Sequence, residues 1–501
     1  METELKLKVA QPDLARLREH HLLTGSPATA PVEHELHDVY YDTPNLDLWQ
    51  NGLTLRVRAE AGGWTQTVKT AAQSSNGLHQ RGEWESVLDG PAPEPATLAK
   101  QIKRSRIAEL LRSPEIGKHL APIFNNTTRR TSWRIVLPDG RKVECALDAG
   151  DLHVGSRNAA IGELEFELKR GNPASLFELA LALHADIPFE IANDSKAARG
   201  YALLHSEPIK PVKATAVRLT KKMSLEDALQ SMGLNCLAQM EANVPGVLKK
   251  SVESLHQMRV GLRRLRALLD MFEEMAPLPA QTRDSLEWLA GELGATRDWD
   301  VLAGSTLAGI QGADVSGLRE IAHQRSQQLH RDMLDKLHEP RYTELILQLN
   351  GWFHARLWRA EGKLPKGSSL ARPAHEAMAP LLRKAQRRLH KRIDTLDQND
   401  APSRHRIRIA AKKTRYAAEF FRDLLPPKQI KSYLRTLEDL QGKLGHLNDL
   451  AVAQELLAQI DAADAAPYVQ YARGYVTAAA EKESRHLGRS LHAIDRMKMT
   501  R

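Results

Sequence analysis

The chain has 501 residues, of which 42% are hydrophobic and 27% are charged, as in ordinary globular proteins of two to four domains. Its two cysteines, Cys145 and Cys236, exclude a disulfide framework and lack the spacing of a metal site, which favours a reducing compartment. No apolar run is long enough to span a membrane, and charges at every second position near the start exclude a signal-peptide core. We therefore expect a cytoplasmic protein that does not engage a membrane.

Charge is distributed unevenly along the chain. Residues 1–210 carry 25 Lys and Arg against 28 Asp and Glu, whereas residues 211–501 carry 46 against 34. The overall net charge of +9 therefore combines −3 in the first part with +12 in the second. An anionic partner is expected in the second part.

The first predicted strand covers residues 2–9 and alternates polar with apolar side chains. Leucine and valine share one face, and the other face carries Glu2, Glu4, Lys6 and Lys8. Two carboxylates at this spacing could hold a hard divalent cation, and a lysine on the same face could contact an anion bound to it. A solvated face of a half-buried strand gives the same pattern, so this run decides nothing by itself.

Strand-like runs of period two continue to about residue 205, apart from helical stretches around residues 13–21, 95–112 and 175–183. Arg, Lys, Asp and Glu side chains occupy one face of most of these runs. Such strands suit an antiparallel barrel with a charged lumen and a covered outside. Cations in that lumen would hold a polyanion, and carboxylates would repel it unless a metal ion lay between them. This combination favours a metal-bound phosphate chain.

Seven motifs occur in order along this part of the chain. They are Glu2-x-Glu4-x-Lys6, Tyr41-Asp42-Thr43-Pro44, Leu55-Arg56-Val57-Arg58, Arg81-x-Glu83-x-Glu85, Asp148-x-Gly150, Glu163-x-Glu165-x-Glu167 and Ser195-Lys196-x-x-Arg199-Gly200-Tyr201. With these motifs, residues 1 to about 205 resemble the CYTH, or triphosphate tunnel metalloenzyme, superfamily. The resemblance implies an antiparallel eight-stranded β-barrel tunnel with flanking helices and metal-dependent chemistry at a triphosphate.

The same resemblance implies a role for each matching residue. The cations that would bind substrate phosphate are Lys6, Arg56, Arg58, Lys69, Arg130, Lys196 and Arg199. The carboxylates that would bind the metal are Glu2, Glu4, Asp148, Glu163, Glu165 and Glu167. The residues that would act in catalysis are Lys6, Arg56, Arg58, Lys69, Glu83 and Glu85. Oxygen-only ligands favour Mg²⁺ or Mn²⁺ over zinc.

The expected activity is metal-dependent hydrolysis of inorganic triphosphate (tripolyphosphate) to pyrophosphate and phosphate. Cations and metal would neutralise the substrate, and a water held by a tunnel carboxylate or a second metal would attack the terminal phosphorus. No residue is assigned as the base. The apolar pattern offers no nucleobase pocket, which favours inorganic triphosphate. The alternatives are a CYTH-type nucleotide cyclase, a thiamine triphosphatase, and a non-catalytic tether that binds polyphosphate.

The second part of the chain is helical and internally duplicated. Prolines at positions 208 and 211 end the strand-rich part, so we expect domains at 1–205 and 218–501 with a linker at 206–217. Residues 256–266 align with 405–415 at a shift of 149, and residues 293–298 align with 444–449 at a shift of 151. Matching order and offset indicate repeats at about 220–360 and 374–497.

Each copy places a basic stripe on one helical face, because positions i, i+3, i+7 and i+10 lie together. The stripes are His256, Arg259, Arg263 and Arg266 in the first copy and His405, Arg408, Lys412 and Arg415 in the second. A solvated basic face explains one such stripe, whereas its duplication favours an anion bound between like charges. The surrounding cations disfavour a histidine metal site.

The repeats resemble the CHAD family over about residues 218–497. This resemblance implies an all-α domain of two pseudo-symmetric helical bundles, and so an α+β protein of two domains, whose second domain binds long-chain polyphosphate. The residues expected to bind it are His256, Arg259, Arg263, Arg264, Arg266, His405, Arg408, Lys412, Lys413 and Arg415. Lysines replace two arginines in the second copy and Asn448 replaces Arg297, so the two halves would bind phosphate unequally.

Nucleic acid is a weaker candidate for the partner of the basic second part. Aromatic residues make up only 5% of the chain, and the basic stripes contain few of them on which bases could stack. Association with polyphosphate granules stays open for a cytoplasmic protein of this kind.

Overall fold

The computed structural model describes residues 2–25, 28–60, 62–70, 73–75, 77–102, 105–205, 208–397, 400–460, 466–495 and 497, without the side chains of Glu2, Gln73–Ser75, Gln80, Arg81 and Asp495. The chain forms two compact units. Unit 1 comprises Met1–Ile209 and Thr343–Ala355, and unit 2 comprises Lys210–Tyr342 and Arg356–Arg501. Each unit has its own hydrophobic core.

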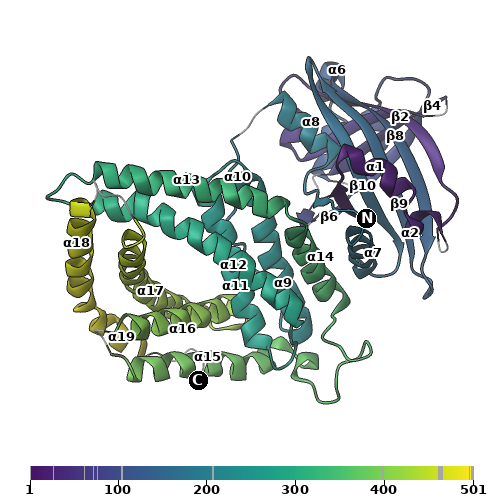
Figure 1. Cartoon of the computed structure of the whole chain (residues 1–501). Helices are drawn as coiled ribbons and strands as arrows, with labels where there is room; N and C mark the ends of the chain where they lie inside the picture. The colour runs from purple at the N-terminus through teal and green to yellow at the C-terminus, as the bar shows by residue number, and fades with distance from the viewer. Residues whose placement is uncertain are drawn as a thin grey trace. The chain divides into compact units, whose positions relative to one another are not determined.

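Unit 1 is built on an antiparallel sheet of eleven strands among the described residues. The strands are β1 (Glu2–Lys8), β2 (Val32–Asp42), β3 (Leu53–Glu60), β4 (Gly63–Thr70), β5 (Gln73–Ser75), β6 (Leu78–Arg81), β7 (Glu83–Leu88), β8 (Ala121–Val136), β9 (Lys142–Val154), β10 (Arg157–Arg170) and β11 (Glu190–Ile191). They pair in the order β5-β6-β1-β10-β9-β8-β2-β3-β4-β7, with β11 beside β1. The described residues show no pairing between the end strands β5 and β7, and the sheet curls strongly (Figure 1).

Side-chain alternation divides this sheet into a core face and a concave polar face. Leu5 and Leu7 of β1 and Leu164 and Phe166 of β10 are fully buried with Phe177 in the core. Each fully buried side chain of this size contributes roughly 2 kcal/mol of transfer free energy. A slip of one residue would exchange the two faces and bury charges in the core, so the apolar pattern fixes the register.

Short helices flank the sheet of unit 1. They are α1 (Leu14–Arg18), α2 (His21–Thr24), α3 (Asp47–Gln50), α4 (Pro95–Leu98), α5 (Arg106–Leu111), α6 (Pro114–His119), α7 (Ala174–His184) and α8 (Lys196–Leu204). Helix α8 packs through Ala197 and Tyr201 on Tyr40 and Phe124. A Cβ atom at Gly200 would lie 2.3 Å from the Phe124 ring, so only glycine permits this close packing.

A segment from the later part of the chain belongs to unit 1. Residues Thr343–Ala355 of α14 (Pro340–Ala355) group with the sheet domain, whereas the sequence places them in the helical domain. Leu347 joins the core cluster of unit 1, and the ring of His354 stacks on Phe177 with 5.4 Å between centroids. The sheet domain is therefore not continuous in sequence.

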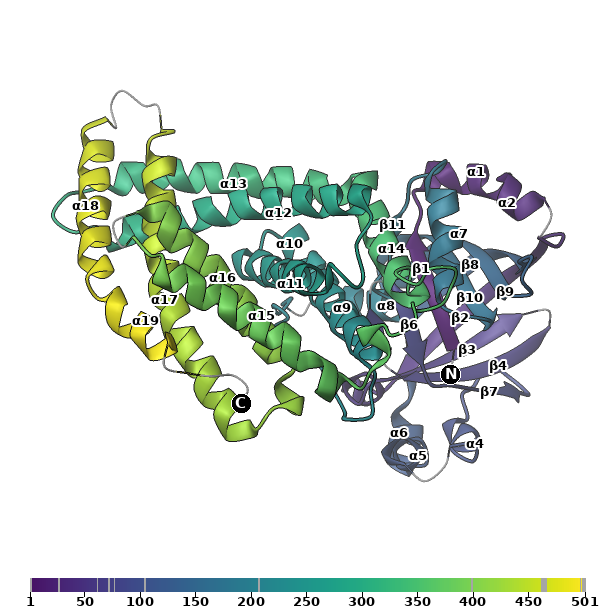
Figure 2. The ribbon, with the colours of Figure 1, turned by 90° about the horizontal axis from the view of Figure 1, so that it is seen from below.

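Unit 2 is built from helices and connecting loops, with no β-strand among its described residues. Its long helices are α9 (Leu225–Glu241), α11 (Val252–Phe272), α12 (Ala280–Val301), α13 (Ser316–His338), α15 (Ala374–Asp394), α16 (Ala401–Phe420), α17 (Pro427–Leu457) and α18 (Ala466–Ser484), with the shorter α10 (Val244–Leu248) and α19 (Leu487–Asp495). Helices α12 and α13 lie side by side, as do α16 and α17 (Figures 1 and 2). The two basic stripes lie on α11 and α16, which pack against each other.

The predicted fold class is confirmed in its architecture, an antiparallel tunnel-type sheet followed by an all-helical domain. The sheet has eleven described strands where eight were expected, because β6 and β11 are short strands beside β1 and β5 is a short strand beside β6. Within the described part of the chain, no helix combines the length and the hydrophobicity needed to cross a membrane.

Candidate functional site

A charged cavity of about 220 Å³ lies on the concave face of the sheet in unit 1. The Lys and Arg side chains that line it are Lys6, Arg56, Arg58, Lys69, Arg130 and Lys196. The carboxylates that line it are Glu4, Asp38, Glu83, Glu85, Glu144, Asp148, Glu165 and Glu167. All six residues predicted to act in catalysis therefore border one cavity, which we call the tunnel cavity.

Strand register places Lys6 beside a carboxylate of β10, the strand that neighbours β1 in the sheet. Lys6 of β1 lies opposite Glu165 of β10, and its ammonium forms a direct ion pair with that carboxylate. The same ammonium lies 3.1 Å from Oε2 of Glu4, and both side chains are almost fully buried. The side chain of Glu2, the other predicted metal ligand on this strand, lies outside the described residues.

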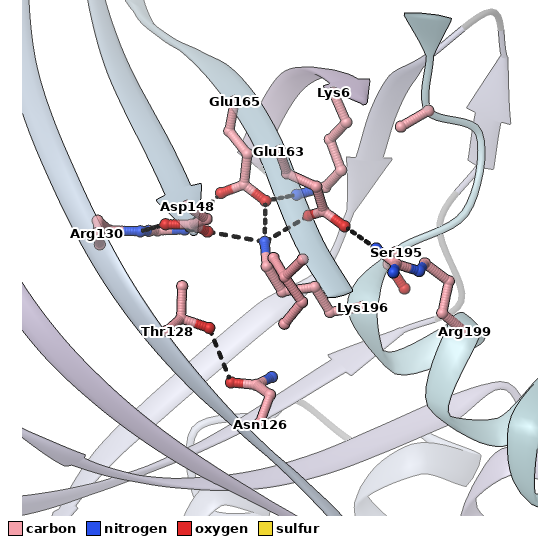
Figure 3. A network of polar contacts seen from close by, with 12 residues as sticks. Lys6, Asn126, Thr128, Arg130, Asp148, Glu163, Glu165, Ser195, Lys196 and Arg199 are labelled. Atoms are coloured by element: carbon pink, nitrogen blue, oxygen red, sulfur yellow. Dashed lines mark hydrogen bonds and ion pairs between the residues drawn. The ribbon is translucent and has the colours of Figure 1, made fainter. Parts of the chain in front are cut away.

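The first turn of α8 adds a second lysine from a distant part of the sequence. Ser195 caps this helix, since its Oγ accepts a backbone N–H of the first turn at 3.2 Å. Nζ of Lys196 then lies 2.5 Å from Oε2 of Glu163, 2.8 Å from Oδ2 of Asp148 and 3.0 Å from Oε1 of Glu165 (Figure 3). One ammonium thus joins carboxylates of two neighbouring strands.

Arg130 of β8 completes this buried network. Its Nε and Nη2 donate to the two oxygens of Asp148 at 2.7 and 2.6 Å, and Nη2 also lies 2.6 Å from Oε2 of Glu165 (Figure 3). Burial alone would raise the pKa of Glu165, but Lys196, Lys6 and Arg130 hold it well below its usual range. The carboxylate is therefore ionised at neutral pH and is neutralised by cations of the protein.

On the opposite wall of the tunnel cavity lies Asp38, a carboxylate that is not among the residues predicted from the sequence. Asp38 of β2 accepts from Nε and Nη2 of Arg58 at 2.7 and 3.0 Å and lies 3.5 Å from Nη1 of Arg56. Burial opposes ionisation, yet the two arginines lower the pKa of Asp38 to about 2. Its position two residues before Tyr40, on the same face of β2, is the pattern that could have revealed it.

The remaining predicted residues of this unit are also held by partners of opposite charge or by a hydroxyl. The contacts are Lys69 with Glu83 (2.8 Å), Glu85 with the Thr67 hydroxyl (2.9 Å), Arg199 with Glu163 (2.7 Å) and Glu167 with Lys169 (2.7 Å). Lys69 lies opposite Glu83 in the β4–β7 register, so strand pairing produces this contact directly.

The donor chemistry of the tunnel cavity fits a hard cation. Carboxylate oxygens are the ligands that Mg²⁺ and Mn²⁺ prefer, and Glu4, Asp148 and Glu165 all face the cavity. Within the described residues, however, no three of these carboxylates bring ligand atoms within 4.8 Å of one another. Lys6 and Lys196 lie between them, so these ammonium groups must move before the carboxylates can share an ion.

A second candidate site is a groove of about 420 Å³ in unit 2, which we call the central groove. The cations that line it are Arg259, Arg263, Arg266, Arg283, Arg408, Lys412 and Lys413, against the two acids Asp270 and Glu287. Six of these seven cations belong to the predicted phosphate-binding set, and they come from α11 and α16. Arg283 of α12 was missed because it lies outside the repeated motif.

Four predicted residues do not line this groove. Arg264 is buried and donates to Oε1 of Gln239 at 2.7 Å and to Oδ1 of Asn235 at 3.0 Å. Successive helical residues are about 100° apart, so Arg264 points away from the face that Arg263 shares with the groove. The others are His256, His405, which contacts Asn448 at 2.8 Å, and Arg415, which lies near Glu419 and Glu438.

Lys412 occupies an unusual position within the central groove. Among the described residues its ammonium forms no hydrogen bond or ion pair, while Arg259, Arg263 and Arg408 act on it as like charges. Burial, reinforced by these arginines, lowers the pKa of Lys412 to about 6. The same effects lower the pKa of Arg408 below its ordinary value. This crowding of cations is unfavourable without an anion.

The comparisons with known proteins agree with this division of the chain. The CYTH domain family model matches residues 1–201, and the CHAD domain family model matches residues 232–458. An inorganic triphosphatase of Haemophilus influenzae is 34% identical over 176 residues, which are 34% of this chain and 47% of that protein. The chain thus matches about half the length of that relative.

Among solved structures, a CHAD domain from the plant Ricinus communis is 35% identical, with a TM-score of 0.53. The match covers 58% of this chain and 99% of that domain. With both family matches in place, the chain belongs to the proteins in which a CYTH domain is followed by a CHAD domain.

Proposed function

We propose that unit 1 hydrolyses inorganic triphosphate to pyrophosphate and phosphate in the tunnel cavity, with Mg²⁺ or Mn²⁺ as cofactor. The observation that carries this proposal is the charge of the cavity lining, six Lys and Arg against eight Asp and Glu. Such a lining binds a highly charged anion only when additional cations accompany it. When bound, the metal would neutralise phosphoryl oxygens and lower the pKa of a water.

The side chains of the cavity then have separable tasks. Lys6, Lys196 and Arg130 would transfer from carboxylates to phosphoryl oxygens, which leaves Glu4 and Glu165 available to hold the cation. The Lys6 and Lys196 side chains are largely buried, and in such surroundings they stabilise the charge of a phosphoryl transition state more strongly than in water. The carboxylates also hold and orient the attacking water.

The lining favours an inorganic substrate over a nucleotide. Tyr40 is the one aromatic side chain among the described residues that line the tunnel cavity, and it is buried against Phe124 with 4.5 Å between ring centroids. A nucleobase or a thiamine ring would therefore find no exposed aromatic surface. The named activity of the Haemophilus influenzae relative supports the same choice.

A substrate panel tests this proposal. Wild-type protein should release phosphate from tripolyphosphate with Mg²⁺ or Mn²⁺, should lose this activity in EDTA, and should act poorly on ATP and thiamine triphosphate. Glu4→Gln should lower kcat/KM by about a hundredfold or more. Asp151→Asn, at an exposed position of the same sheet, is the matched control and should retain full activity. Full turnover in Glu4→Gln would contradict the metal assignment, and an inactive wild type would favour a non-catalytic tether.

We also propose that the central groove of unit 2 binds long-chain polyphosphate. Its seven cations against two acids support an anionic ligand, as does the ammonium of Lys412, which has no counter-charge in contact among the described residues. Competition of polyphosphate with single-stranded RNA at several salt concentrations tests this proposal. Tighter binding of RNA than of polyphosphate would refute it.

A further inference from the structure

A second groove of about 650 Å³ lies in unit 2 between α15, α16 and the C-terminal half of α11. We call it the outer groove. The cations that line it are Lys384, Arg388, Lys391, Arg392, Arg406 and Lys413, against the single acid Asp270. Apart from Lys413, none of these cations belongs to the set that the sequence predicts to bind polyphosphate.

The cations of the outer groove form two rows on neighbouring helices. Lys384, Arg388 and Lys391 of α15 are spaced by four and three residues, so they share one helical face over roughly 10 Å. Arg406 and Lys413 of α16 are seven residues apart and share a face for the same reason. Helices α15 and α16 pack side by side (Figure 1), so the two rows border one groove.

The outer groove is continuous with the central groove. Ala267, Asp270, Ile409 and Lys413 line both of them. At this junction, Oδ2 of Asp270 lies 3.0 Å from Nζ of Lys413 and 3.5 Å from Nη1 of Arg388. Asp270 therefore pairs with Lys413, which lines both grooves, and with Arg388 of the outer groove. These pairs lie where a ligand would pass from one groove to the other.

We propose that the outer groove is a second polyphosphate subsite, which binds the part of a long inorganic phosphate chain that extends beyond the central groove. Asp270 would weaken binding at the junction because it competes with phosphate for two cations. This inference rests on the proposed binding of polyphosphate by the central groove.

Two observations favour a phosphate chain over a solvated helix face or a site for nucleic acid. A merely solvated helix face usually mixes acids with bases, whereas here six cations and one acid line a concave surface, and two of the cations, Lys384 and Arg406, also pair with Glu274 and Asp400 outside the lining. No aromatic side chain among the described residues lines the outer groove, so a nucleic acid would have nothing on which to stack its bases. An inorganic chain needs only the cations.

Substitutions in the full chain test the subsite. The outer variant is Lys391→Ala with Arg392→Ala, since both side chains are exposed and neither forms a hydrogen bond or ion pair among the described residues. The matched control is Lys428→Ala with Lys431→Ala, which removes two exposed cations from α17 outside both grooves. The central variant is Arg266→Ala with Lys412→Ala. Equilibrium binding of long-chain polyphosphate, tripolyphosphate and single-stranded RNA is measured in EDTA over a range of salt.

We expect the outer variant to weaken binding of long-chain polyphosphate about tenfold and to lower the salt slope by about 1.4, as for two lost phosphate contacts. Binding of tripolyphosphate should not change, and the control variant should match the wild type. Asp270→Asn should bind the long chain about threefold more tightly, because Lys413 and Arg388 are released.

The opposing outcomes separate the two proposals. If the central variant loses affinity and the outer variant behaves like the control, the outer subsite is refuted while polyphosphate binding by unit 2 stands. If the wild type binds no polyphosphate of any length, both are refuted. If the outer variant loses affinity for RNA more than for polyphosphate, the groove serves nucleic acid and the proposal fails.

Discussion

Two partly buried lysines, Lys196 and Lys412, show how the surroundings of a residue decide its chemistry. Carboxylates of three residues surround Lys196 in the tunnel cavity and raise its pKa well above the ordinary value despite its burial. Lys412 in the central groove is partly buried among arginines, and this burial together with the like charges lowers its pKa to about 6. The Lys196 ammonium already pairs with carboxylates and must leave them to bind phosphate. The Lys412 ammonium pairs with no carboxylate among the described residues, and it becomes protonated when an anion binds.

This difference predicts that binding at the central groove takes up a proton. Because the pKa of Lys412 is lowered, the folded protein without ligand leaves it neutral above about pH 6, whereas the unfolded chain keeps it charged up to its ordinary pKa of 10.5. The contribution of Lys412 to stability therefore rises with pH across this window. Arg259 and Arg263 of α11, Arg408 of α16 and Asp449 are the charged groups that act on it.

Calorimetry of polyphosphate binding at pH 8, in buffers with different ionisation enthalpies, should detect uptake of about one proton. The affinity should fall as the pH rises from about 6 toward 10. Lys412→Arg should abolish this uptake, because a guanidinium stays charged. Lys413→Arg is the control, since the Lys413 ammonium pairs with Asp270 at 3.0 Å. Equal proton uptake in both variants would assign the effect to another group.

At the scale of elements, helix α8 depends on a buried carboxylate far away in the sequence. Oδ1 of Asp42 accepts backbone N–H groups of Thr43 and Leu48, while its Oδ2 accepts from the Trp49 amide and, at 2.8 Å, from the Tyr201 hydroxyl. Asp42 thus joins α3 to α8. The position of Lys196 and Arg199, on the first turns of α8, rests on this contact.

Tyr201→Phe should therefore lower both stability and activity. Loss of a hydrogen bond to a buried carboxylate costs about 2 kcal/mol, and looser packing of α8 should reduce kcat/KM for tripolyphosphate. Scanning calorimetry and hydrogen exchange of α8 amides measure the two effects. The control is Tyr41→Phe, whose hydroxyl donates to the carbonyl of Pro91 at 3.1 Å at an exposed position. Unchanged exchange in α8 would show that the contact does not hold the helix.

On the scale of the whole molecule, the two candidate sites lie in units with separate cores. Unit 1, however, is made of two separate segments of the chain, Met1–Ile209 and Thr343–Ala355. The core of unit 1 includes Leu347, which lies far beyond the predicted linker at 206–217. A fragment that stops at residue 209 therefore lacks part of its own core. Function of the sheet domain is better studied in the full chain.

Truncation after residue 209 should accordingly destabilise the sheet domain. Loss of a fully buried leucine and its neighbours removes several kcal/mol of packing, so the fragment should unfold at a lower temperature than the same domain in the full chain. Leu347→Ala in the full chain should reproduce part of this loss, whereas Leu357→Ala, at an exposed leucine, should not. Differential scanning calorimetry compares the four proteins, and an unchanged fragment would refute the role of residues 343–355.

Local sequence pattern is sufficient to predict which side chains share a face. Strand alternation places Lys6, Arg56 and Arg58 on the polar side of the sheet, and helical periodicity places Arg263 and Lys412 on basic stripes, because both patterns depend only on neighbouring residues. Strand and helix periodicity, together with the family motifs, were enough to predict the fold class and most of the charged residues that line the tunnel cavity and the central groove.

Which groups meet depends instead on tertiary packing. The pairing of Asp38 with Arg58 and of Lys196 with Glu163, the inward turn of Arg264, and the place of Leu347 in the core of unit 1 all join segments far apart in sequence. The outer groove also depends on tertiary packing, because its cations lie on two helices and line one surface only when these helices pack together. Periodicity orients a side chain about its own element, whereas its partner depends on long-range register and on helix packing.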